Sequence, residues 1–392
     1  MSKGLAIIGI GEVPTKTMPQ RTRWDIIYDT VMEAVRDSGL NKNDIEGVAM
    51  CAPQCQPLLQ TELSFGKLPE ELGLKGCKDS VIVNAGGAST SDAFRMAEHW
   101  LNNGTCKAVI VEHCTVQSDI PPAELIGFFG KAGVDLQWEY PLGVTYNLIM
   151  GNMANWYMHK TGTTPLEMAA VTTALRSWAT KDPNSIFYGK PVPTPEQVLE
   201  SDVLATPLHK RESNVLGDGG CAMVCVSHET AKAMGKPAAY KLSESTRFFS
   251  ASFTERDFGG VYEGWASGAQ EAIAKAGLTI KDIGLFNIYV AYACGHPMMA
   301  EALGLAAPGQ AGKMFLDGKF SFGGEIGWST IGEAPGRGHT GSGVSAACYC
   351  ETARQLMGKA GERQIKDLKY AFQNAGGGSG FNNICSIWGR EI

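Results

Sequence analysis

The chain has 392 residues, of which 44% are hydrophobic, 19% are charged and 48 are glycine. This length exceeds one ordinary domain and suits two closely packed halves of roughly 200 residues each. The composition is typical of an α/β protein with tight strand-to-helix turns, and the low charge favours an oligomer. A net charge of -6 offers no basic surface for nucleic acid, and no apolar run approaches the roughly 18 residues that suggest a membrane span. We therefore expect a cytoplasmic protein that binds neither nucleic acid nor membrane.

The first predicted element is an apolar strand, AIIGIGEVPT (6–15), which follows the start of the chain without a signal-peptide pattern. An amphipathic helix then ends at Gly39, where a left-handed residue is needed, and Asp44 precedes an apolar strand that reaches Met50. The segment 84–104 opens with small residues and continues as an apolar helix, and the strand VIVEHC (109–114) follows it. Helix and strand thus alternate from the start.

The region from about 119 to 207 interrupts this alternation with aromatic and proline-rich stretches. We interpret it as an inserted loop domain over an active site, since loops on a rigid scaffold often carry function. A plain surface connection is the alternative.

The second part of the chain repeats the first. Segment 272–288 matches 34–50 at an offset of 238 residues without a gap, so that Gly277 corresponds to Gly39 and Asp282 to Asp44. Segment 338–358 likewise matches 84–104, and the strand YAFQNA (370–375) follows it. We expect duplicated halves, 1–245 with the insertion and 246–392, that form two mixed sheets with helices on their faces about a pseudo-twofold axis.

Eleven cysteines raise the question of a metal site. Their closest pairs, such as Cys221 with Cys225 and Cys348 with Cys350, do not repeat as CxxC knuckles, and no histidine pair at ligand spacing stands beside them. We predict no metal, and buried free thiols in a reducing cytoplasm.

Several motifs together resemble the thiolase superfamily, closest to the thiolases of the sterol-carrier-protein-x type and their bacterial relatives. They are the first strand, VNAGGASTSDAF (83–94), PLHKRESNVLGDGG (207–220), IYVAYACGHPMMAEALGL (288–305), GHTGSG (338–343) and QNAGGGSGFNN (373–383). The resemblance covers nearly the whole chain. It implies the five-layered αβαβα thiolase fold, a coenzyme A thioester as substrate, no covalently bound cofactor, and a homodimer or larger assembly.

The chain departs from this family at the residues that carry its chemistry. Gly87 stands where the nucleophilic cysteine belongs, Asn374 replaces the second, proton-shuttling cysteine, and Tyr289 replaces a histidine. The family's Asn-x-x-Gly-Gly element reads Ser-Thr-Ile-Gly-Glu (329–333). What remains is the active-site histidine, His339, in its glycine-rich turn.

The resemblance extends to relatives that lack the nucleophile and cleave steroid side-chain CoA esters as aldol lyases. By this reading His339 binds the thioester oxygen, and the backbone N–H groups of Gly87 and Gly376 form a second anion site. Tyr289, with Tyr292 as a second candidate, moves the proton. Asparagine cannot exchange a proton near neutral pH, so Asn374 would act through hydrogen bonds alone.

Two alternatives stay open. The chain is either a true thiolase whose nucleophile lies elsewhere, at Cys114 or Cys294, or a non-catalytic thiolase-like subunit.

His296 is a candidate substrate-binding residue because it lies close to Tyr289 in sequence. Since bacterial relatives often work with a small zinc-ribbon and OB-fold protein, we expect such a partner as well. Aromatic residues of the insertion suit a bulky acyl group or, equally, a dimer core: Phe128, Phe129, Trp138, Tyr140, Tyr146 and Trp156.

Overall fold

The computed structural model describes residues 4–52, 63–118, 120–131, 133–341, 343–378, 380 and 382–392. Its strands are β1 (Leu5–Lys16), β2 (Gly47–Cys51), β3 (Asp79–Val83), β4 (Ala108–Thr115), β5 (Val203–Ala205), β6 (Leu208–His209), β7 (Asp218–Ser227), β8 (Ala239–Phe248), β9 (Ile283–Ile288), β10 (Gly327–Trp328), β11 (Tyr370–Gly377) and β12 (Asn382–Gly389). Its α-helices are α1 (Arg23–Ser38), α2 (Ser64–Glu71), α3 (Ser89–Asn103), α4 (Pro122–Lys131), α5 (Tyr146–Thr161), α6 (Pro165–Ala179), α7 (Pro195–Leu199), α8 (His228–Met234), α9 (Phe258–Lys275), α10 (Gly295–Ala302), α11 (Ala311–Leu316), α12 (Glu333–Arg337) and α13 (Gly343–Leu356).

The pairing of the strands confirms the duplication. The main sheet has the order β10-β9-β11-β12-β8-β1-β7-β4-β2-β3. Read outward from the centre, β8-β12-β11-β9-β10 repeats β1-β7-β4-β2-β3, with the same two antiparallel pairs followed by the same two parallel pairs. The halves meet through a short antiparallel contact between β1 and β8.

The repeat extends to local detail. Gly39 ends α1 with φ +77°, and Gly277 follows α9 with φ +72°, a conformation that glycine adopts without strain. In each half a single 3₁₀ turn follows, and the carboxylate of Asp44 or Asp282 caps it by accepting the backbone N–H three residues earlier. These were the sequence positions that indicated the duplication.

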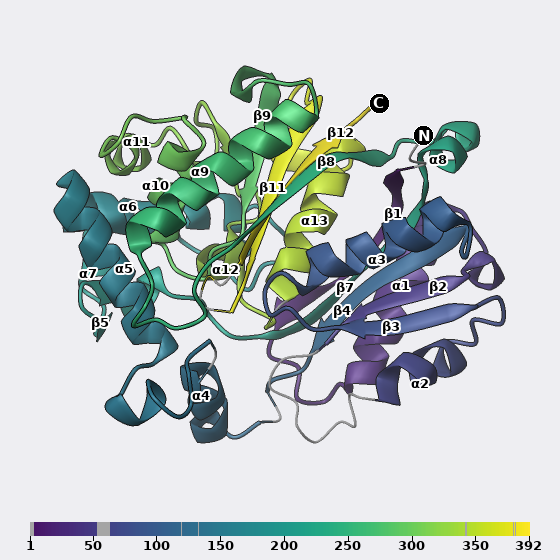
Figure 1. Ribbon diagram of the computed structural model, residues 1–392, viewed down its shortest axis with the longest axis horizontal. Coiled ribbons are helices and arrows are strands. Elements are labelled where there is room, and N and C mark those ends of the chain that lie inside the picture. The colour runs from purple at the N-terminus through teal and green to yellow at the C-terminus, as the bar shows by residue number, and fades with distance from the viewer. Residues whose placement is uncertain are drawn as a thin grey trace.

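The layers follow from which helices contact which strands. On one outer face α1 packs against β1, β7 and β4, and on the other α9 packs against β8 and β12. Between the two halves of the sheet, α3 packs on strands of the N-terminal half, and α13 packs on strands of both halves. Figure 1 shows α13 and α3 in the middle of the molecule, with α9 on the side away from α1. This is the expected αβαβα arrangement.

The inserted region carries α4 to α7; α5, α6 and α7 lie on the left side of Figure 1, and α4 lies below them. Helix α6 is buried along most of its length and contacts α10, α11 and α12 of the C-terminal half. The insertion therefore packs on the half to which it does not belong in sequence.

The boundary expected near residue 245 falls within β8. Because β8 pairs along its length with β12, the whole strand belongs with the C-terminal half. The pairing thus divides the two halves of the sheet before Ala239. The two mixed sheets expected from the sequence are joined into one by the contact between β1 and β8.

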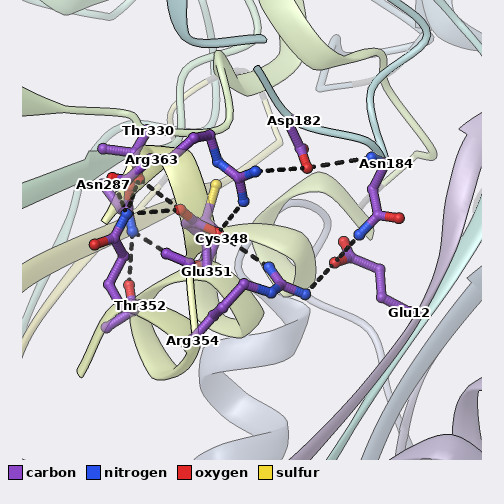
Figure 2. Close-up of polar contacts among 12 residues, drawn as sticks. Glu12, Asp182, Asn184, Asn287, Thr330, Cys348, Glu351, Thr352, Arg354 and Arg363 are labelled. Atoms are coloured by element: carbon purple, nitrogen blue, oxygen red, sulfur yellow. Dashed lines mark hydrogen bonds and ion pairs between the residues drawn. The ribbon is translucent and has the colours of Figure 1, made fainter. Parts of the chain in front are cut away.

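Six charged side chains, five of them buried and Arg354 partly buried, form a closed ring of alternating sign, which we call the charge ring. Going round it, each residue pairs with the next and the last pairs with the first: Arg337, Glu12, Arg354, Glu351, Arg363 and Asp182. They come from β1, the insertion, α12, α13 and the turn after α13. Figure 2 shows several of these side chains converging, with Asn184 of the insertion donating a further hydrogen bond to Glu12.

The charge ring stabilises the fold only while it is complete, because removing one partner leaves a buried charge uncompensated. Burial raises the pKa of Glu351, but Arg363 and Arg354 outweigh it and hold the pKa at about 2, against an ordinary 4.5. A depressed carboxylate pKa stabilises the folded state fully above about pH 4.5, and this stabilisation is lost as the pH falls towards 2.

We predict that Glu351→Gln lowers the free energy of unfolding by about 3 kcal/mol at pH 7, since it removes the anion that two arginines share. Because the variant has no carboxylate to protonate, its melting temperature should fall less steeply than that of the unmodified protein between pH 5 and pH 3. Calorimetric melting across this pH range measures both effects. If the melting temperatures of the variant and of the unmodified protein fell equally between pH 5 and pH 3, the loss of stability in acid would not come from Glu351.

Within the described residues, no helix combines the length and the apolar character needed to cross a membrane.

Candidate active site

The candidate site forms where loops from both halves meet. Gly87 lies just before α3, Tyr289 directly after β9, and His339 in the turn before α13, while Asn374 and Gly376 belong to β11. Five of the seven residues predicted from the sequence therefore come together. Ser342 of the histidine turn lies outside the described residues.

The turn of His339 is fixed by backbone hydrogen bonds. The N–H of His339 donates to the carbonyl of Val215 at 2.6 Å. Its own carbonyl accepts from the N–H of Gly217 at 3.0 Å and from the side chain of Gln117 at 3.0 Å. Gly338 has φ +113°, which favours glycine, and Arg337 of the charge ring comes directly before it. The position of the imidazole thus depends on both halves of the chain.

The imidazole of His339 is buried. Its Nε2 lies 3.3 Å from the hydroxyl of Tyr289, and the ring of Phe129 meets its edge at a centroid distance of 6.1 Å. Nδ1 has no hydrogen-bond partner among the described residues. Burial, with the neighbouring His113, lowers the pKa of His339 to about 3. The imidazole is therefore neutral at physiological pH.

The ring of Tyr289 occupies the space beside Gly87 that a side chain at position 87 would need. A Cβ atom on Gly87 would lie 2.2 Å from Cε1 of Tyr289 and 2.4 Å from the carbonyl oxygen of Gly376. Neither distance is compatible with a real contact. Position 87 therefore accepts only glycine while Tyr289 keeps this position.

Asn374 holds Tyr289 in place. Its Oδ1 accepts the backbone N–H of Tyr289 at 2.9 Å, and its Nδ2 donates to Oδ1 of Asn383 at 3.1 Å. The amide is almost fully buried. These contacts suit a residue that positions Tyr289.

A pocket opens beside Tyr289. Its polar walls are Asn374, Asn382, Asn383 and the glycines after β11, and its apolar walls come from α5 and α9. The lining side chains from these two helices are Tyr146, Met150, Met153, Phe258, Val261 and Trp265. Arg256 lines the same pocket. The insertion thus contributes to the site through α5 and through Phe129.

Tyr292 and His296 are not among the described residues that line this pocket. The hydroxyl of Tyr292 donates to Oδ1 of Asn147, and its ring packs on Tyr146. His296 is fully buried, and its Nδ1 accepts from the indole N–H of Trp328 at 3.1 Å. His296 lies close to Tyr289 in sequence, but its ring does not reach the pocket, because it points from α10 into the hydrophobic core.

The aromatic residues of the insertion have different surroundings. Phe129 and Tyr146 reach the site, whereas Trp138 is 75% exposed and Phe128 is 45% exposed. Tyr140 and Trp156 pack against the hydrophobic core.

Two residues near the site were not predicted to take part. Glu333 is fully buried with φ +52°, and its Oε1 accepts from the thiol of Cys348 at 3.0 Å. Burial raises the pKa of Glu333 to about 8. The sequence marked position 333 only as a departure from the family pattern. Arg256 gave no motif signal at all.

Among the described residues there is no group of three or more histidine, cysteine, aspartate or glutamate side chains placed to hold a metal ion.

We predict that Gly87→Ala destabilises the protein by about 1–3 kcal/mol, the usual effect of an added methyl group in a filled space. The matched control is Gly66→Ala in the exposed part of α2, where an added Cβ meets nothing within 4 Å. Thermal melting of both variants measures the difference. Equal melting temperatures would show that Tyr289 is not fixed beside Gly87.

Comparison with known proteins shows which proteins this chain is similar to. Residues 250–390 match the family model "Thiolase C-terminal domain-like". An acetyl-CoA acetyltransferase of Methanothermobacter thermautotrophicus is 25% identical over 99% of this chain and 100% of its own length. A 17-hydroxy-3-oxo-4-pregnene-20-carboxyl-CoA lyase of Mycobacterium tuberculosis is 24% identical over 96% of this chain and 97% of its own. The solved Ltp2-ChsH2(DUF35) aldolase is 22% identical with a TM-score of 0.83, covering 99% of this chain and 98% of its own. The chain has the thiolase fold throughout and a thiolase C-terminal domain in its second half, and so is a relative of the thiolases.

Proposed function

We propose that the chain is an acyl-CoA carbon–carbon lyase that cleaves a β-hydroxyacyl-CoA by a retro-aldol reaction, or forms one in reverse, without an acyl-enzyme. The single observation that carries the proposal is the placement of Tyr289. Its ring fills the space beside Gly87, and its hydroxyl lies 3.3 Å from Nε2 of His339. The position of the nucleophile thus holds a group that can move a proton but cannot hold an acyl group. Relatives named as an acyl-CoA lyase and an aldolase support the same chemistry.

The proton transfer fits a neutral tyrosine. Burial raises the pKa of Tyr289 well above 10, so the shift is opposite to the one that a phenolate base would need. Retro-aldol cleavage, however, only moves the proton of the β-hydroxyl to the α-carbon. We infer that the breaking Cα–Cβ bond leaves its electron pair on the α-carbon as enolate charge, that Tyr289 gives its own proton to this carbon, and that Tyr289 accepts the proton of the β-hydroxyl in exchange. It is therefore neutral before and after the Cα–Cβ bond breaks.

The negative charge of the enolate needs hydrogen-bond donors at the thioester oxygen. Neutral His339 supplies one when Nε2 carries the hydrogen, since Nε2 is the nitrogen that faces Tyr289. We assign the second anion site, for the oxygen on the β-carbon, to the backbone N–H groups of Gly87 and Gly376, two residues whose backbones lie close together. Asn374 takes part as a positioning residue through the backbone of Tyr289.

A thiolase with a displaced nucleophile is less well supported. A reactive thiolate needs a lowered pKa and access to solvent. Cys114 and Cys294 are fully buried, and burial raises the pKa of both thiols. Turnover that survives iodoacetamide treatment would speak for the lyase, and loss of turnover for the thiolase.

We infer that the active assembly contains a second copy of the chain and a small partner of the zinc-ribbon and OB-fold type. The edge strand β3 is partly exposed along its whole length, and such an edge can pair with another chain. The name of the Ltp2-ChsH2(DUF35) aldolase pairs that protein with a DUF35 protein, which supports a partner of this kind here. The alternative of a non-catalytic subunit would gain if the chain bound no CoA ester with or without the partner.

We predict that Tyr289→Phe abolishes lyase turnover, since it removes the hydroxyl that moves the proton, while the affinity for a CoA ester is kept. The matched control is Tyr292→Phe, because that hydroxyl binds Asn147 outside the pocket. Turnover and the dissociation constant of a saturated acyl-CoA are measured for both variants. Full activity of Tyr289→Phe would exclude the proposed role, and loss in Tyr292→Phe alone would move that role to Tyr292.

The rate should depend little on pH between about 5 and 9. His339, with a pKa of about 3, stays neutral throughout this range, and Tyr289, with a pKa raised above 10, stays protonated. The measurement is kcat against pH, with the melting temperature followed in parallel. If kcat changed steeply near pH 6 or 7 while the melting temperature did not, another group would carry the proton.

Co-expression with a neighbouring gene for a small zinc-ribbon and OB-fold protein should yield a zinc-containing complex with two copies of this chain. Light scattering gives the mass of the complex, and metal analysis assigns the zinc to the small subunit. A monomer that cleaves the substrate without a partner would contradict both parts of the inference.

A further inference from the structure

We propose that a second pocket, which we call the insertion pocket, binds a phosphate or diphosphate group through the guanidinium of Arg176. Its lining residues come from α6 and from the segments 187–202 and 210–215, and its volume is about 770 Å³. It shares no described lining residue with the pocket beside Tyr289. The inference therefore goes beyond the lyase reaction and does not depend on it.

Arg176 is a buried cation without a counter-ion. Its side chain comes from α6, and the residue is 9% exposed. Its Nε donates to the carbonyl of Pro335 at 2.7 Å, and the guanidinium carbon lies 3.2 Å from the ring centroid of Phe187. Within the part of the chain that the structure describes, no carboxylate pairs with Arg176, and neither Nη nitrogen has a hydrogen-bond acceptor. Both nitrogens are thus available to a ligand in the insertion pocket.

The charge of Arg176 calls for an anion, because a buried cation is costly while it stays unpaired. Burial, and after it the charge of Arg211, lowers the pKa of Arg176 from the ordinary 12.5 to about 9. The guanidinium is therefore still charged at neutral pH. An anion at the two Nη nitrogens would counteract both effects, since it favours the charged form.

The mouth of the insertion pocket carries an excess of positive charge. Its lining includes Lys190, Lys210 and Arg211, which are all exposed. Glu200 and Asp202 are the carboxylates among the described lining residues, and neither forms an ion pair with these cations. With Arg176, the cations thus outnumber the carboxylates, although the whole chain has a net charge of -6. Such a local excess attracts anions from solution.

The arrangement of the cations suits a phosphate better than a carboxylate. Nη1 of Arg211 donates to the carbonyl of Gln197 at 2.7 Å, and Nζ of Lys190 lies 5.4 Å from the ring centroid of Phe187, the ring on which Arg176 stacks. A guanidinium binds a phosphate through two parallel hydrogen bonds. A phosphate ester has further acceptor oxygens and more than one negative charge near neutral pH, so it can reach a second cation at the same time.

The insertion pocket lies directly behind the turn of His339. Val215 lines the pocket, and its carbonyl accepts the N–H of His339 at 2.6 Å. Pro335, which accepts from Arg176, belongs to α12, the helix that ends just before the same turn. This place suits the phosphate groups of a coenzyme A moiety whose thioester lies at His339, and equally a separate phosphate ester. The chemistry of recognition is the same for both sources.

The test measures binding by titration calorimetry with pyrophosphate, a saturated acyl-CoA and the corresponding acyl-pantetheine, which lacks the phosphates. Arg176→Met keeps the volume and removes the charge. It should weaken pyrophosphate binding by roughly thirtyfold or more, the effect of removing one partner of a buried charge pair, and leave acyl-pantetheine binding unchanged.

A second variant and a matched control guard against an effect on folding. Arg211→Met changes an exposed lining residue and should weaken pyrophosphate binding by roughly twofold to fivefold, as expected for an exposed charge. Arg390→Met is the control, because Arg390 is also exposed but is not among the described lining residues of the insertion pocket. Melting temperatures of all three variants show whether they fold.

Competition between the probes identifies the source of the phosphate. If pyrophosphate displaces the acyl-CoA but not the acyl-pantetheine, the site holds the phosphates of coenzyme A. If pyrophosphate and the acyl-CoA bind together, and Arg176→Met weakens pyrophosphate alone, the site takes a separate phosphate ester.

The inference is wrong if Arg176→Met and Arg211→Met bind pyrophosphate as tightly as Arg390→Met does. It is also wrong if malonate, a dicarboxylate, binds the unmodified protein as tightly as pyrophosphate. Turnover of β-hydroxyacyl-CoA esters is a separate measurement. The phosphate site can therefore be confirmed while the lyase fails, and the lyase can be confirmed while the phosphate site fails.

Discussion

The charge ring is the constraint on which the rest of the structure depends. Its six members come from segments of both halves of the chain and of the insertion, and all but the partly buried Arg354 are buried where a lone charge would be costly. The ring therefore closes only when β1, the insertion and the helices around His339 are all in place. Arg337 is both a member of the ring and the last residue of α12, directly before the histidine turn. The geometry of the imidazole is thus tied to the complete assembly of both halves.

The site itself shows two residues that fit each other. Tyr289 takes the space that a side chain at position 87 would need, and Gly87 is the residue that allows it. Asn374 fixes the backbone of Tyr289 in a place where the family has a second cysteine. The three departures from the thiolase pattern are therefore one structural change rather than three separate losses. They leave a tyrosine hydroxyl beside a neutral imidazole, which under the proposed function replaces the covalent step by proton transfer.

Much of the fold could be predicted because the duplication leaves the same local signals twice. Gly39 and Gly277 with their following aspartates, and the two apolar helices after glycine-rich turns, indicated the elements and their order. The resemblance to the thiolase motifs also pointed to Gly87, Tyr289, His339, Asn374 and Gly376, which the structure brings to one place. Prediction from sequence failed for His296, whose direction depends on how α10 packs, and for the assignment of β8, which depends on its partner strand. Neither the charge ring nor the direction of the Tyr289 pKa shift has a sequence pattern, because both arise from burial among distant segments.

The exclusion of any side chain at position 87 also bears on how this protein can evolve. The thiolase reaction requires a cysteine there, yet a cysteine beside an unchanged Tyr289 would collide with the ring and with the carbonyl of Gly376. Replacing Tyr289 first would, under the proposed function, remove the group that moves the proton before any nucleophile existed. Either substitution alone thus gives a protein with neither activity, and selection would act against both single variants. Under the proposed function, the thiolase reaction and the lyase reaction are therefore separated by single variants with neither activity, and only simultaneous changes at positions 87 and 289 avoid them.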